Sequence, residues 1–412
     1  MKYLLRRSLA LLVMISCPLP VQAVPLHVFV TDAPYSADGS DNEDDSPAFK
    51  AALEAIKTAG GGVLVIPEGL YLFDEAVEFN SDSQVSEQWK DNLTIECGTG
   101  SQARLRSRNT KGVFLFTCRQ YAQKYPRITI RNLIFEAGQI PGAPQPPGAL
   151  SSGTAIQMNK EKRGAQPART LTVEDVTIRS LNVNCYFQNG IVAINSLHPL
   201  IKNCSFTAPG IMATTGFDVS GSYGPVFDAC SVTGASTAYK MRSETAYNER
   251  VQDTTTGEWK WPNQPEDGAF RNCTADRCHT GIDFEVLLEQ EDSTLDPSDQ
   301  PTLWITGCTI TARDVGVLVN GRRLMQITGN TFEPLEDAAQ MTDIKLRSVH
   351  LGILKENIFS GGPRAKNIHV DSEGDSLILG PNSASQSSPV YHSEAQLNRN
   401  VKMVAPFTNF TN

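Results

Sequence analysis

A four-residue motif recurs eight times along the chain, and this repeat constrains the fold more than any other feature of the sequence. From the third copy onward, successive copies begin 26, 43, 35, 22 and 27 residues apart. The shortest spacing corresponds to one coil of a β-helix, so the longer spacings indicate loops inserted into a coil. Self-similarity of this kind is typical of solenoids, in which each coil packs on its neighbours. The copies are residues 132–135, 175–178, 203–206, 229–232, 272–275, 307–310, 329–332 and 356–359.

A second strand precedes the motif by 11 residues wherever no insertion intervenes, as Val219 precedes Cys230. Within this strand the apolar residues alternate with polar ones, so Phe217 and Val219 should point inward and Asp218 outward. Because each strand pairs with its equivalent in the next coil, equivalent positions stack about 4.8 Å apart. The sequence therefore predicts an all-β chain that forms a single-stranded parallel β-helix with a short N-terminal capping helix. We expect one domain over residues 24–412, divided into a cap (24–75), coils (76–370) and a C-terminal coil and tail (371–412).

The first 23 residues have the features of a secretory signal peptide. Lys2, Arg6 and Arg7 precede an apolar run over residues 9–15, and residues 21–23 form a small-residue cleavage site. The apolar run is too short to cross a bilayer, which needs about 20 residues, and no later segment qualifies. We therefore expect an exported protein, periplasmic or secreted, without a transmembrane segment. Cys17 leaves open a lipid-anchored variant.

The charge balance limits the classes of partner. The formal net charge is −9 and no stripe of lysine and arginine stands out, so a nucleic-acid partner is not expected. An anionic polysaccharide would need a local basic patch on this acidic protein. The six histidines are scattered and no Cys/His grouping has zinc spacing, so we predict neither a metal site of that type nor a cofactor. The acidic stretch of residues 38–45 leaves a calcium loop possible.

The cysteines are expected to be mostly core residues. Nine are present, eight of them beyond the signal peptide, and an even number in an oxidising compartment is compatible with disulfides. However, Cys204, Cys230, Cys273 and Cys308 occupy equivalent points of the repeat, which predicts an unpaired stack of small buried side chains. The pairings that remain open are Cys97 with Cys118 and Cys273 with Cys278.

A different pattern precedes the repeat. A strand over residues 28–32 leads into the acidic turn, after which Ser46 is the expected N-cap of a helix over residues 47–58, with Pro47 at its first position. Three consecutive glycines then end the helix before an apolar strand and a Gly-Leu-Tyr segment. This order resembles the opening of the pectate-lyase-like right-handed β-helix superfamily, including polygalacturonase-related proteins. The resemblance implies a capped, right-handed β-helix and a polysaccharide as partner, but it defines no activity.

Aligning the second strands produces a row of outward side chains in which charge converges on three consecutive coils. Asp218, Lys240 and Asp283 lie in this row, and Arg242 and Glu285 lie in the next outward row. No other part of the repeat is expected to reach this charge density. We predict these five residues as catalytic. The simpler alternative is a ladder of cross-strand ion pairs, each contributing about 0.2–1 kcal/mol.

The two longest insertions, residues 243–268 and 287–300, flank this patch and are expected to form the walls of a cleft. Tyr247, Trp259 and Trp261 in the first insertion are candidates for stacking on sugar rings, although they could equally form a small core within the loop. His279, just before the strand that carries Asp283, is a further candidate substrate-binding residue, or a turn histidine without such a role.

Two reactions are compatible with the charged patch. Inverting hydrolysis needs two carboxyl groups about 6.5–9.5 Å apart, for which Asp283 and either Glu285 or Asp218 are candidates. β-Elimination from a uronate needs a base for the C5 proton and a cation for the adjacent carboxylate, for which Lys240 and Arg242 are candidates.

Family motifs do not decide between these reactions. The Asn-Thr-Asp, Gly-His-Gly and Arg-Ile-Lys segments of polygalacturonases are absent, and the only Asp-Asp pair lies in the N-terminal turn. Residues 216–218 loosely resemble the Gly-Phe-Asp of mannuronan epimerases, but Val219 and Ser220 replace the Pro-His that follows there. We therefore expect an exported protein that cleaves an acidic polysaccharide by one of these two reactions. The alternative is a non-catalytic polysaccharide-binding or surface-adhesion protein.

Overall fold

The recurrent motif is a corner at which the chain turns from one strand into the next. In the computed structural model, the first residue of all eight copies has a φ of between 49° and 65°. This left-handed conformation reverses the usual strand geometry over one residue, and glycine and asparagine tolerate it best. Ala229 and Glu356 adopt it without those advantages, with φ of 51° and 59°. The residues in question are Asn132, Asp175, Asn203, Ala229, Asn272, Gly307, Gly329 and Glu356.

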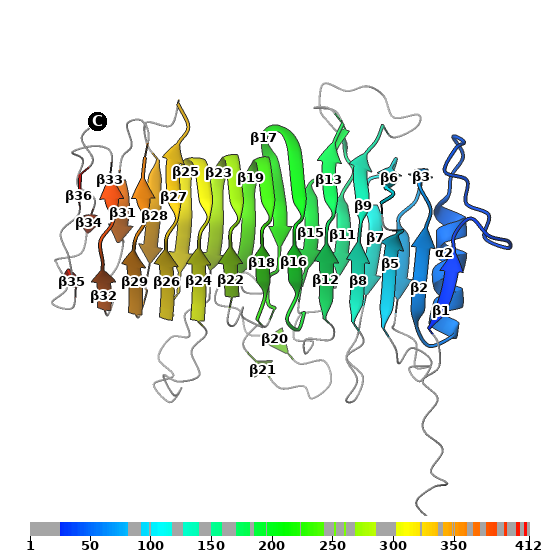
Figure 1. Cartoon of the computed structure of the whole chain (residues 1–412), viewed down its shortest axis with the longest axis horizontal. Coiled ribbons are helices and arrows are strands. Elements are labelled where there is room, and N and C mark those ends of the chain that lie inside the picture. The colour runs from blue at the N-terminus through cyan, green and yellow to red at the C-terminus, as the bar shows by residue number, and fades with distance from the viewer. Residues whose placement is uncertain are drawn as a thin grey trace, which may run out of the picture.

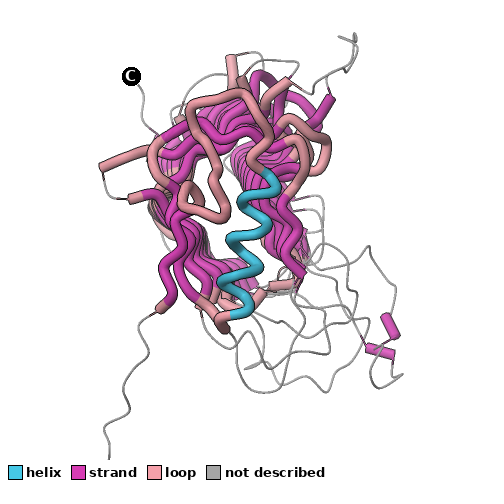
Figure 2. The backbone as a smooth tube through the Cα atoms, turned by 90° about the vertical axis from the view of Figure 1, so that its right-hand side faces the viewer, coloured by secondary structure: helices cyan, strands magenta, loops and turns pink. Residues whose placement is uncertain are grey.

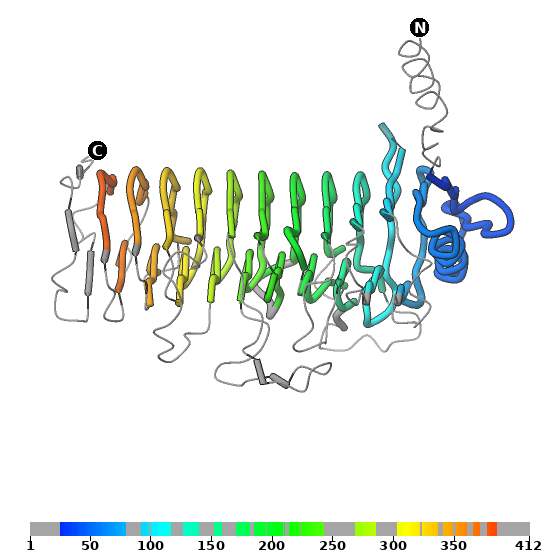
Figure 3. The backbone as a smooth tube through the Cα atoms, turned by 90° about the horizontal axis from the view of Figure 1, so that it is seen from below, coloured from blue at the N-terminus to red at the C-terminus, as the bar shows by residue number. Residues whose placement is uncertain are grey.

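The structure describes residues 25–409, except for 81–91, 99, 118–126, 140–149, 159–169, 182–184, 195, 223, 243–250, 253–258, 261–267, 286–301, 322–323, 337–340, 348, 350, 361–365, 371–375, 385–390, 394–400 and 404–407. The paired strands of successive coils are parallel, and the coils follow one another along the axis (Figures 1 and 3). The chain is thus a right-handed parallel β-helix, as the repeat and the resemblance predicted. Among the described residues, no helix is long and apolar enough to cross a membrane.

Face 1 of the β-helix is a sheet of 13 strands that precede the corners. In sheet order they are β1 (Leu26–Phe29), β2 (Gly62–Ile66), β5 (Leu93–Cys97), β8 (Ile128–Arg131), β12 (Leu171–Glu174), β16 (Leu200–Lys202), β18 (Val226–Asp228), β22 (Gly268–Arg271), β24 (Thr302–Thr306), β26 (Leu324–Thr328), β29 (Leu351–Lys355), β32 (Ser376–Leu379) and β35 (Val401–Met403).

Faces 2 and 3 are two parts of one 19-stranded sheet, which bends between them. Face 2 follows the corners and contains β3 (Gly69–Phe73), β6 (Ala103–Ser107), β9 (Leu133–Ala137), β13 (Thr177–Ser180), β27 (Thr331–Pro334), β30 (Ile358–Phe359), β33 (Ser383–Ala384) and β36 (Thr408–Asn409). Face 3 contains β4 (Val77–Asn80), β7 (Gly112–Thr117), β11 (Thr154–Met158), β15 (Asn189–Ala193), β28 (Thr342–Arg347), β31 (Lys366–Val370) and β34 (Tyr391–Ser393).

Four long strands run without interruption from face 2 into face 3, and they occupy the middle of the β-helix. Their first halves pair with face 2 strands and their second halves with face 3 strands. They are β17 (Ser205–Asp218), β19 (Ser231–Arg242), β23 (Thr274–Glu285) and β25 (Thr309–Asn320). Two further pairs lie outside these faces: β10 (Leu150–Ser151) with β14 (Cys185–Tyr186), and β20 (Val251–Gln252) with β21 (Trp259–Lys260).

Helix α2 (Ser46–Thr58) lies across the N-terminal end of the coils (Figure 2). The face predicted to be apolar is buried, with Phe49, Ala52, Leu53 and Ile56 each at most 1% exposed. Phe49 packs edge-on against Phe73 of β3, with ring centroids 4.8 Å apart. The helix therefore covers side chains that an open end of the solenoid would expose.

The predicted N-cap is displaced by one residue. Asp45 occupies the cap position and Ser46 is already helical. The Asp45 carboxylate accepts hydrogen bonds from the backbone N–H groups of Leu72 and Asp38, both at 2.9 Å, and makes no bond to the helix. Burial raises the pKa of Asp45 to about 6 despite these two bonds. The Asp45 side chain thus links the start of the helix to the backbone of β3, and it does not cap the helix.

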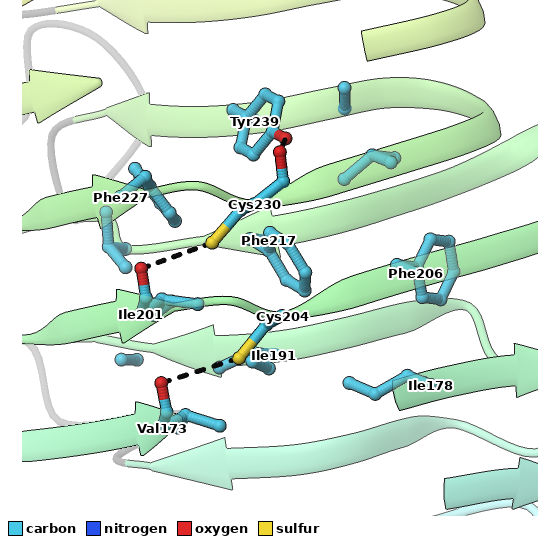
Figure 4. Close-up of a cluster of buried hydrophobic side chains, with 14 of the residues drawn as sticks. Val173, Ile178, Ile191, Ile201, Cys204, Phe206, Phe217, Phe227, Cys230 and Tyr239 are labelled. Carbon is cyan, nitrogen blue, oxygen red and sulfur yellow. Dashed lines mark hydrogen bonds between the residues drawn. The ribbon is translucent and has the colours of Figure 1, made fainter. Parts of the chain in front are cut away.

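The cysteine stack is present in the core (Figure 4). Cys204, Cys230, Cys273 and Cys308 are each 1% exposed and are not disulfide-bonded. The thiols of Cys204, Cys230 and Cys308 face carbonyl oxygens of the preceding coil, as Cys204 Sγ does at 3.4 Å from Val173 O. Side chains that leave a parallel sheet in the same direction keep the strand spacing, whereas a disulfide brings its Cβ atoms to about 3.8 Å.

The stack continues with asparagines where the motif changes. Asn330 and Asn357 are fully buried, and Asn330 Nδ2 donates to Asn357 Oδ1 at 3.0 Å. The alternative pairing of Cys273 with Cys278 is wrong, because both are buried free cysteines. Cys97 is also free, and its candidate partner Cys118 lies outside the described residues.

Replacing Leu53 with Asp should destabilise the protein by several kcal/mol, because the charge would lie among apolar side chains at the end of the core. Urea unfolding followed by circular dichroism measures this, with Glu54→Asp, on the exposed side of the same helix, as the control. Equal stability of Leu53→Asp and the unchanged protein would mean that the helix does not cap the coils.

Titration of the denatured protein without reductant should detect at least the four free thiols of the stack. Non-reducing peptide mapping would assign them to Cys204, Cys230, Cys273 and Cys308. Recovery of any of these four in a disulfide-linked peptide would contradict the stack.

Candidate functional site

The outward row predicted on face 3 has the register that the sequence indicated. Val192 pairs with Asp218, Asp218 with Lys240, and Lys240 with Asp283, each one coil further along. The neighbouring row likewise pairs Arg242 with Glu285. These strands bring the five predicted catalytic residues together at the ends of β17, β19 and β23. We call Asp218, Lys240, Arg242, Asp283 and Glu285 the charged patch.

The first ion pair of the patch joins Lys240 to Asp218. Lys240 Nζ donates to Asp218 Oδ2 at 3.0 Å. The other carboxylate oxygen accepts from the backbone N–H of Ser220 at 3.1 Å and from the Ser220 hydroxyl. This short-range bond forms because Asp218 ends its strand and the chain turns two residues later. Asp218 is 8% exposed, so Lys240 is the accessible member of the pair.

The second centre is Arg242, which bonds to two carboxylates of the next coil. Its Nε and Nη2 donate to Asp283 Oδ2, with the Nε bond at 3.1 Å, and Nη1 lies 3.1 Å from Glu285 Oε2. Asn320 Nδ2 donates to Glu285 Oε1 at 3.0 Å from the following coil. Burial alone would lower the pKa of Arg242. Its hydrogen bond to Asp283 and the nearby carboxylates have the larger effect, so the pKa is raised overall. Arg242 is therefore a fixed cation.

The cations of the patch are more exposed than the carboxylates. The side chains of Lys240 and Arg242 are 31% and 38% exposed, whereas those of Asp218, Asp283 and Glu285 are 12%, 5% and 13% exposed. Short acidic side chains thus lie close to the sheet, and the longer basic ones extend over them. The side chains most accessible to a ligand are therefore the two cations, although the patch carries three carboxylates.

One polar atom of the patch is not satisfied. Asp283 Oδ1 is buried and has no hydrogen-bond partner among the described residues. An unpaired buried oxygen costs about 1–3 kcal/mol, more when the group is charged.

The other candidate residues are not joined to the patch by any contact that the structure describes. Tyr247, Trp261 and residues 287–300 lie outside the described residues. Trp259 belongs to β21, where its backbone pairs with Gln252 of β20. The prediction of a turn before the strand of Asp283 is wrong, because His279 lies inside β23. Its Nδ1 lies 2.9 Å from Asp314 Oδ2 of β25, a contact separate from the patch.

A second charged cluster was missed by the sequence analysis. Glu136 of β9 is fully buried on the outward side of face 2 and bonds to Arg104, Arg106 and Arg179. The expectation that charge converges only on the patch is therefore wrong. The signal was present, since Glu136 and Arg179 each directly follow a copy of the motif, but only the motif residues themselves were compared.

The described residues contain no group of three or more His, Cys, Asp or Glu side chains placed to hold a metal ion. In the acidic turn, which we considered as a calcium loop, the carboxylates accept internal hydrogen bonds. Asp38 Oδ1 accepts from the Ser40 backbone and hydroxyl, and Asp44 Oδ1 accepts from the backbone N–H of Asp74.

Comparison with solved structures shows which class this architecture defines. The A-module of mannuronan C-5 epimerase AlgE6 from Azotobacter vinelandii matches with a TM-score of 0.55 and 15% identity, covering 93% of this chain and 99% of the module. Tailspike protein 3 of bacteriophage CBA120 matches with a TM-score of 0.53 and 13% identity, covering 98% of this chain and 68% of the tailspike. At such identities the likeness establishes the fold alone, a parallel β-helix.

The family follows from the sequence. Residues 30–283, more than half of the chain, match the model of the family "Rhamnogalacturonase A/epimerase, pectate lyase-like". The chain belongs to this pectate-lyase-like family, as its N-terminal order of elements had indicated. The match extends from the N-terminal strand to Asp283 of the charged patch. No curated protein sequence shows a significant match.

Replacing Arg242 with Met should lower the free energy of unfolding by about 1–3 kcal/mol, because the buried Asp283 carboxylate would lose its cation. The double variant Arg242→Met/Asp283→Leu should recover most of this loss, since it removes both charges. Urea unfolding of the two variants measures the difference. Equal losses in both variants would show that the ion pair does not account for the effect.

Proposed function

We propose that this protein is exported and acts on an acidic polysaccharide, which lies across the charged patch and is cleaved by β-elimination. The observation that carries this proposal is the exposure of Lys240 and Arg242 above carboxylates that are nearly inaccessible. A cationic spot on a protein of net charge −9 is a specific arrangement, and the carboxylates of a polyuronate are its natural complement. Membership of a pectate-lyase-like family supports a sugar polymer as the ligand.

In the proposed reaction, Arg242 holds the carboxylate of a uronate and so reduces the negative charge that opposes loss of the C5 proton. Its position is fixed by Asp283 and Glu285, which leaves part of the planar guanidinium for the ligand. Preorganisation of this kind is effective because the donor need not move when charge develops.

Lys240 takes the C5 proton in this scheme. It can do so only as a neutral amine, so it must first release a proton to solvent, and its hydrogen bond to Asp218 at 3.0 Å holds it in position. The C5–H electrons form the C4–C5 double bond, the bond from C4 to the glycosidic oxygen breaks, and the departing oxygen takes a proton from water. The products are an unsaturated uronate end and a shortened chain.

Hydrolysis is less compatible with this arrangement. It requires one carboxylic acid at the glycosidic oxygen and a second carboxylate at a water molecule. Asp283 and Glu285 share one guanidinium, and Asp218 is occupied by Ser220 and Lys240. Each carboxylate would have to leave its partner to reach a substrate.

The second candidate function is binding without cleavage, favoured by the fact that every charge of the patch has a partner.

The proposal is tested by incubating the purified protein with acidic and neutral polysaccharides and recording both ultraviolet absorbance of unsaturated ends and new reducing ends. Elimination raises both signals on an acidic polymer. Lys240→Ala should lower the rate about 10²–10⁴-fold, as expected for loss of a general base. Asp283→Asn should also lower it strongly, because Arg242 loses its anchor. Lys202→Ala, on exposed face 1, is the matched control and should keep full activity.

Other outcomes distinguish the alternatives. Reducing ends without ultraviolet absorbance would indicate hydrolysis, and binding without either signal would indicate a non-catalytic protein. Incorporation of solvent deuterium at C5 without chain cleavage would mean that the abstracted proton is replaced rather than followed by elimination. Full activity of both Lys240→Ala and Asp283→Asn on a confirmed substrate would remove the charged patch from the mechanism.

A further inference from the structure

The cluster on face 2 has a geometry that the charged patch does not share. Arg106, Glu136 and Arg179 occupy the same row on three consecutive coils, so the carboxylate lies between two arginines. Arg104 lies two residues before Arg106 on the same strand and reaches Glu136 as well, with Nε at 3.1 Å from Oε1. Arg106 Nη2 and Arg179 Nη2 complete the set at 2.8 and 2.6 Å. We call these four residues the arginine cluster.

The charges of the arginine cluster do not balance. Three guanidinium groups surround one carboxylate, which leaves two positive charges, and within the described residues none of the three arginines forms an ion pair with a second carboxylate. Burial would raise the pKa of Glu136, but its hydrogen bonds to Arg179 and Arg106 and the nearby charges lower it. The carboxylate is therefore ionised and fully used by the cluster.

The arginines remain accessible although Glu136 is fully buried. The exposed fractions of Arg104, Arg106 and Arg179 are 38%, 25% and 43%, against 0% for Glu136. Each guanidinium bonds to Glu136 through its Nε and Nη2 atoms, an arrangement that leaves Nη1 without a partner among the described residues and available to an external acceptor. Converging arginines of this kind suit planar oxyanions, which accept two N–H bonds at once.

Beyond the cluster, one outward row of face 2 carries only hydroxyl groups, while the row that continues from Arg179 also carries Asp276. Starting beside Arg179, one outward row continues through five further coils at about 4.8 Å per coil, and all of its members are at least partly exposed. Hydroxyls both donate and accept hydrogen bonds, which matches the groups of a neutral sugar. The row consists of Thr177, Ser205, Ser231, Thr274, Thr309 and Thr331.

We propose that the arginine cluster is a second anion-binding site, which takes a carboxylate of an acidic polysaccharide while the neighbouring sugar units lie along the hydroxyl row. Glu136 holds the three guanidinium groups in place and the ligand neutralises their excess charge. The site lies on face 2, whereas the charged patch lies on face 3. It would therefore anchor a polymer whether or not the patch cleaves it, and the inference is independent of the proposed reaction.

A purely structural role is the competing explanation, in which the arginines only neutralise Glu136. One arginine is sufficient for that purpose, as Arg131 and Glu96 illustrate on face 1 with a one-to-one pair. Three arginines in one place repel one another, and Glu136 balances only one of their three charges. An anionic ligand would offset that repulsion, and the two explanations therefore differ in whether added polymer stabilises the protein.

The test is equilibrium binding of polygalacturonate, dextran and inorganic sulfate to the full-length protein. Arg104→Gln/Arg179→Gln removes the two most exposed arginines and leaves Arg106 to pair with Glu136, so the buried carboxylate keeps a cation. Arg131→Gln/Lys202→Gln removes the same charge from face 1 and is the matched control. All variants are also measured in a Lys240→Ala background, in which the proposed cleavage is stopped.

Polygalacturonate should bind the Arg104→Gln/Arg179→Gln protein at least about tenfold more weakly, as expected for the loss of charge-assisted hydrogen bonds, and the control should bind normally. The polymer should also raise the melting temperature of the unchanged protein and not that of the variant, because a ligand stabilises the state that binds it. Dextran should not bind. If sulfate binds with the same affinity per charge as the polymer, the site binds free anions, and the assignment to a polysaccharide is wrong.

Equal weakening by the cluster variant and by the face 1 control would indicate non-specific attraction and contradict the site. If Lys240→Ala abolishes polymer binding and the arginine replacements do not weaken it, the polymer binds at the charged patch alone and the second site is wrong. A single Arg179→Gln variant repeats the measurement should the double variant fail to fold. If neither site variant changes polymer binding, both proposals for these residues are wrong.

Discussion

The in-register hydrogen bonding between successive coils is the constraint on which the rest of the structure depends. Each strand of face 1 pairs in parallel with the strand one coil before and one coil after it. A residue therefore has its equivalents from the two neighbouring coils directly beside it, at about 4.8 Å. Any functional site on this protein has to be assembled from rows, and its composition is set by which side chains occur at equivalent positions of adjacent coils.

The corners maintain this register, and their chemistry changes along the molecule. In the middle coils the residue after the left-handed position is a cysteine, which fits the core as a small side chain with its thiol toward a carbonyl. From Asn330 onward it is an asparagine, whose amide bonds to the next asparagine and, at the junction, accepts from the Cys308 backbone N–H at 2.9 Å. Cysteine and asparagine both fit the buried corner. The cysteines make weak hydrogen bonds there, and the asparagines make stronger ones that link the coils directly.

The sequence was sufficient to predict the β-helix, the capping helix and the rows of the charged patch, because all three follow from periodicity. Asp218, Lys240 and Asp283 could be aligned once an inward residue of each strand was fixed. The errors occurred where a side chain had a choice of partners that periodicity does not determine. Asp45, not Ser46, occupies the N-cap position, and its carboxylate accepts a hydrogen bond from the backbone of β3. His279 does not lie in a turn, and its ring contacts Asp314 of the next coil. The arginine cluster was missed because Glu136 and Arg179 lie one residue beyond the motif copies that were compared.

The two charged sites share one physical arrangement, in which longer basic side chains extend over shorter acidic ones that lie against the sheet. On a flat parallel sheet an outward aspartate or glutamate is easily covered by a lysine or arginine from the next coil, since the coils are closer together than the basic side chains are long. The carboxylate loses solvent and gains a cation, and the cation keeps its contact with water. A chain with a net charge of −9 can therefore present cationic surfaces without an excess of basic residues. What distinguishes the two sites is the ratio of the charges among the described residues: two cations over three carboxylates in the patch, and three cations over one carboxylate in the cluster, where the proposed ligand would offset the excess positive charge.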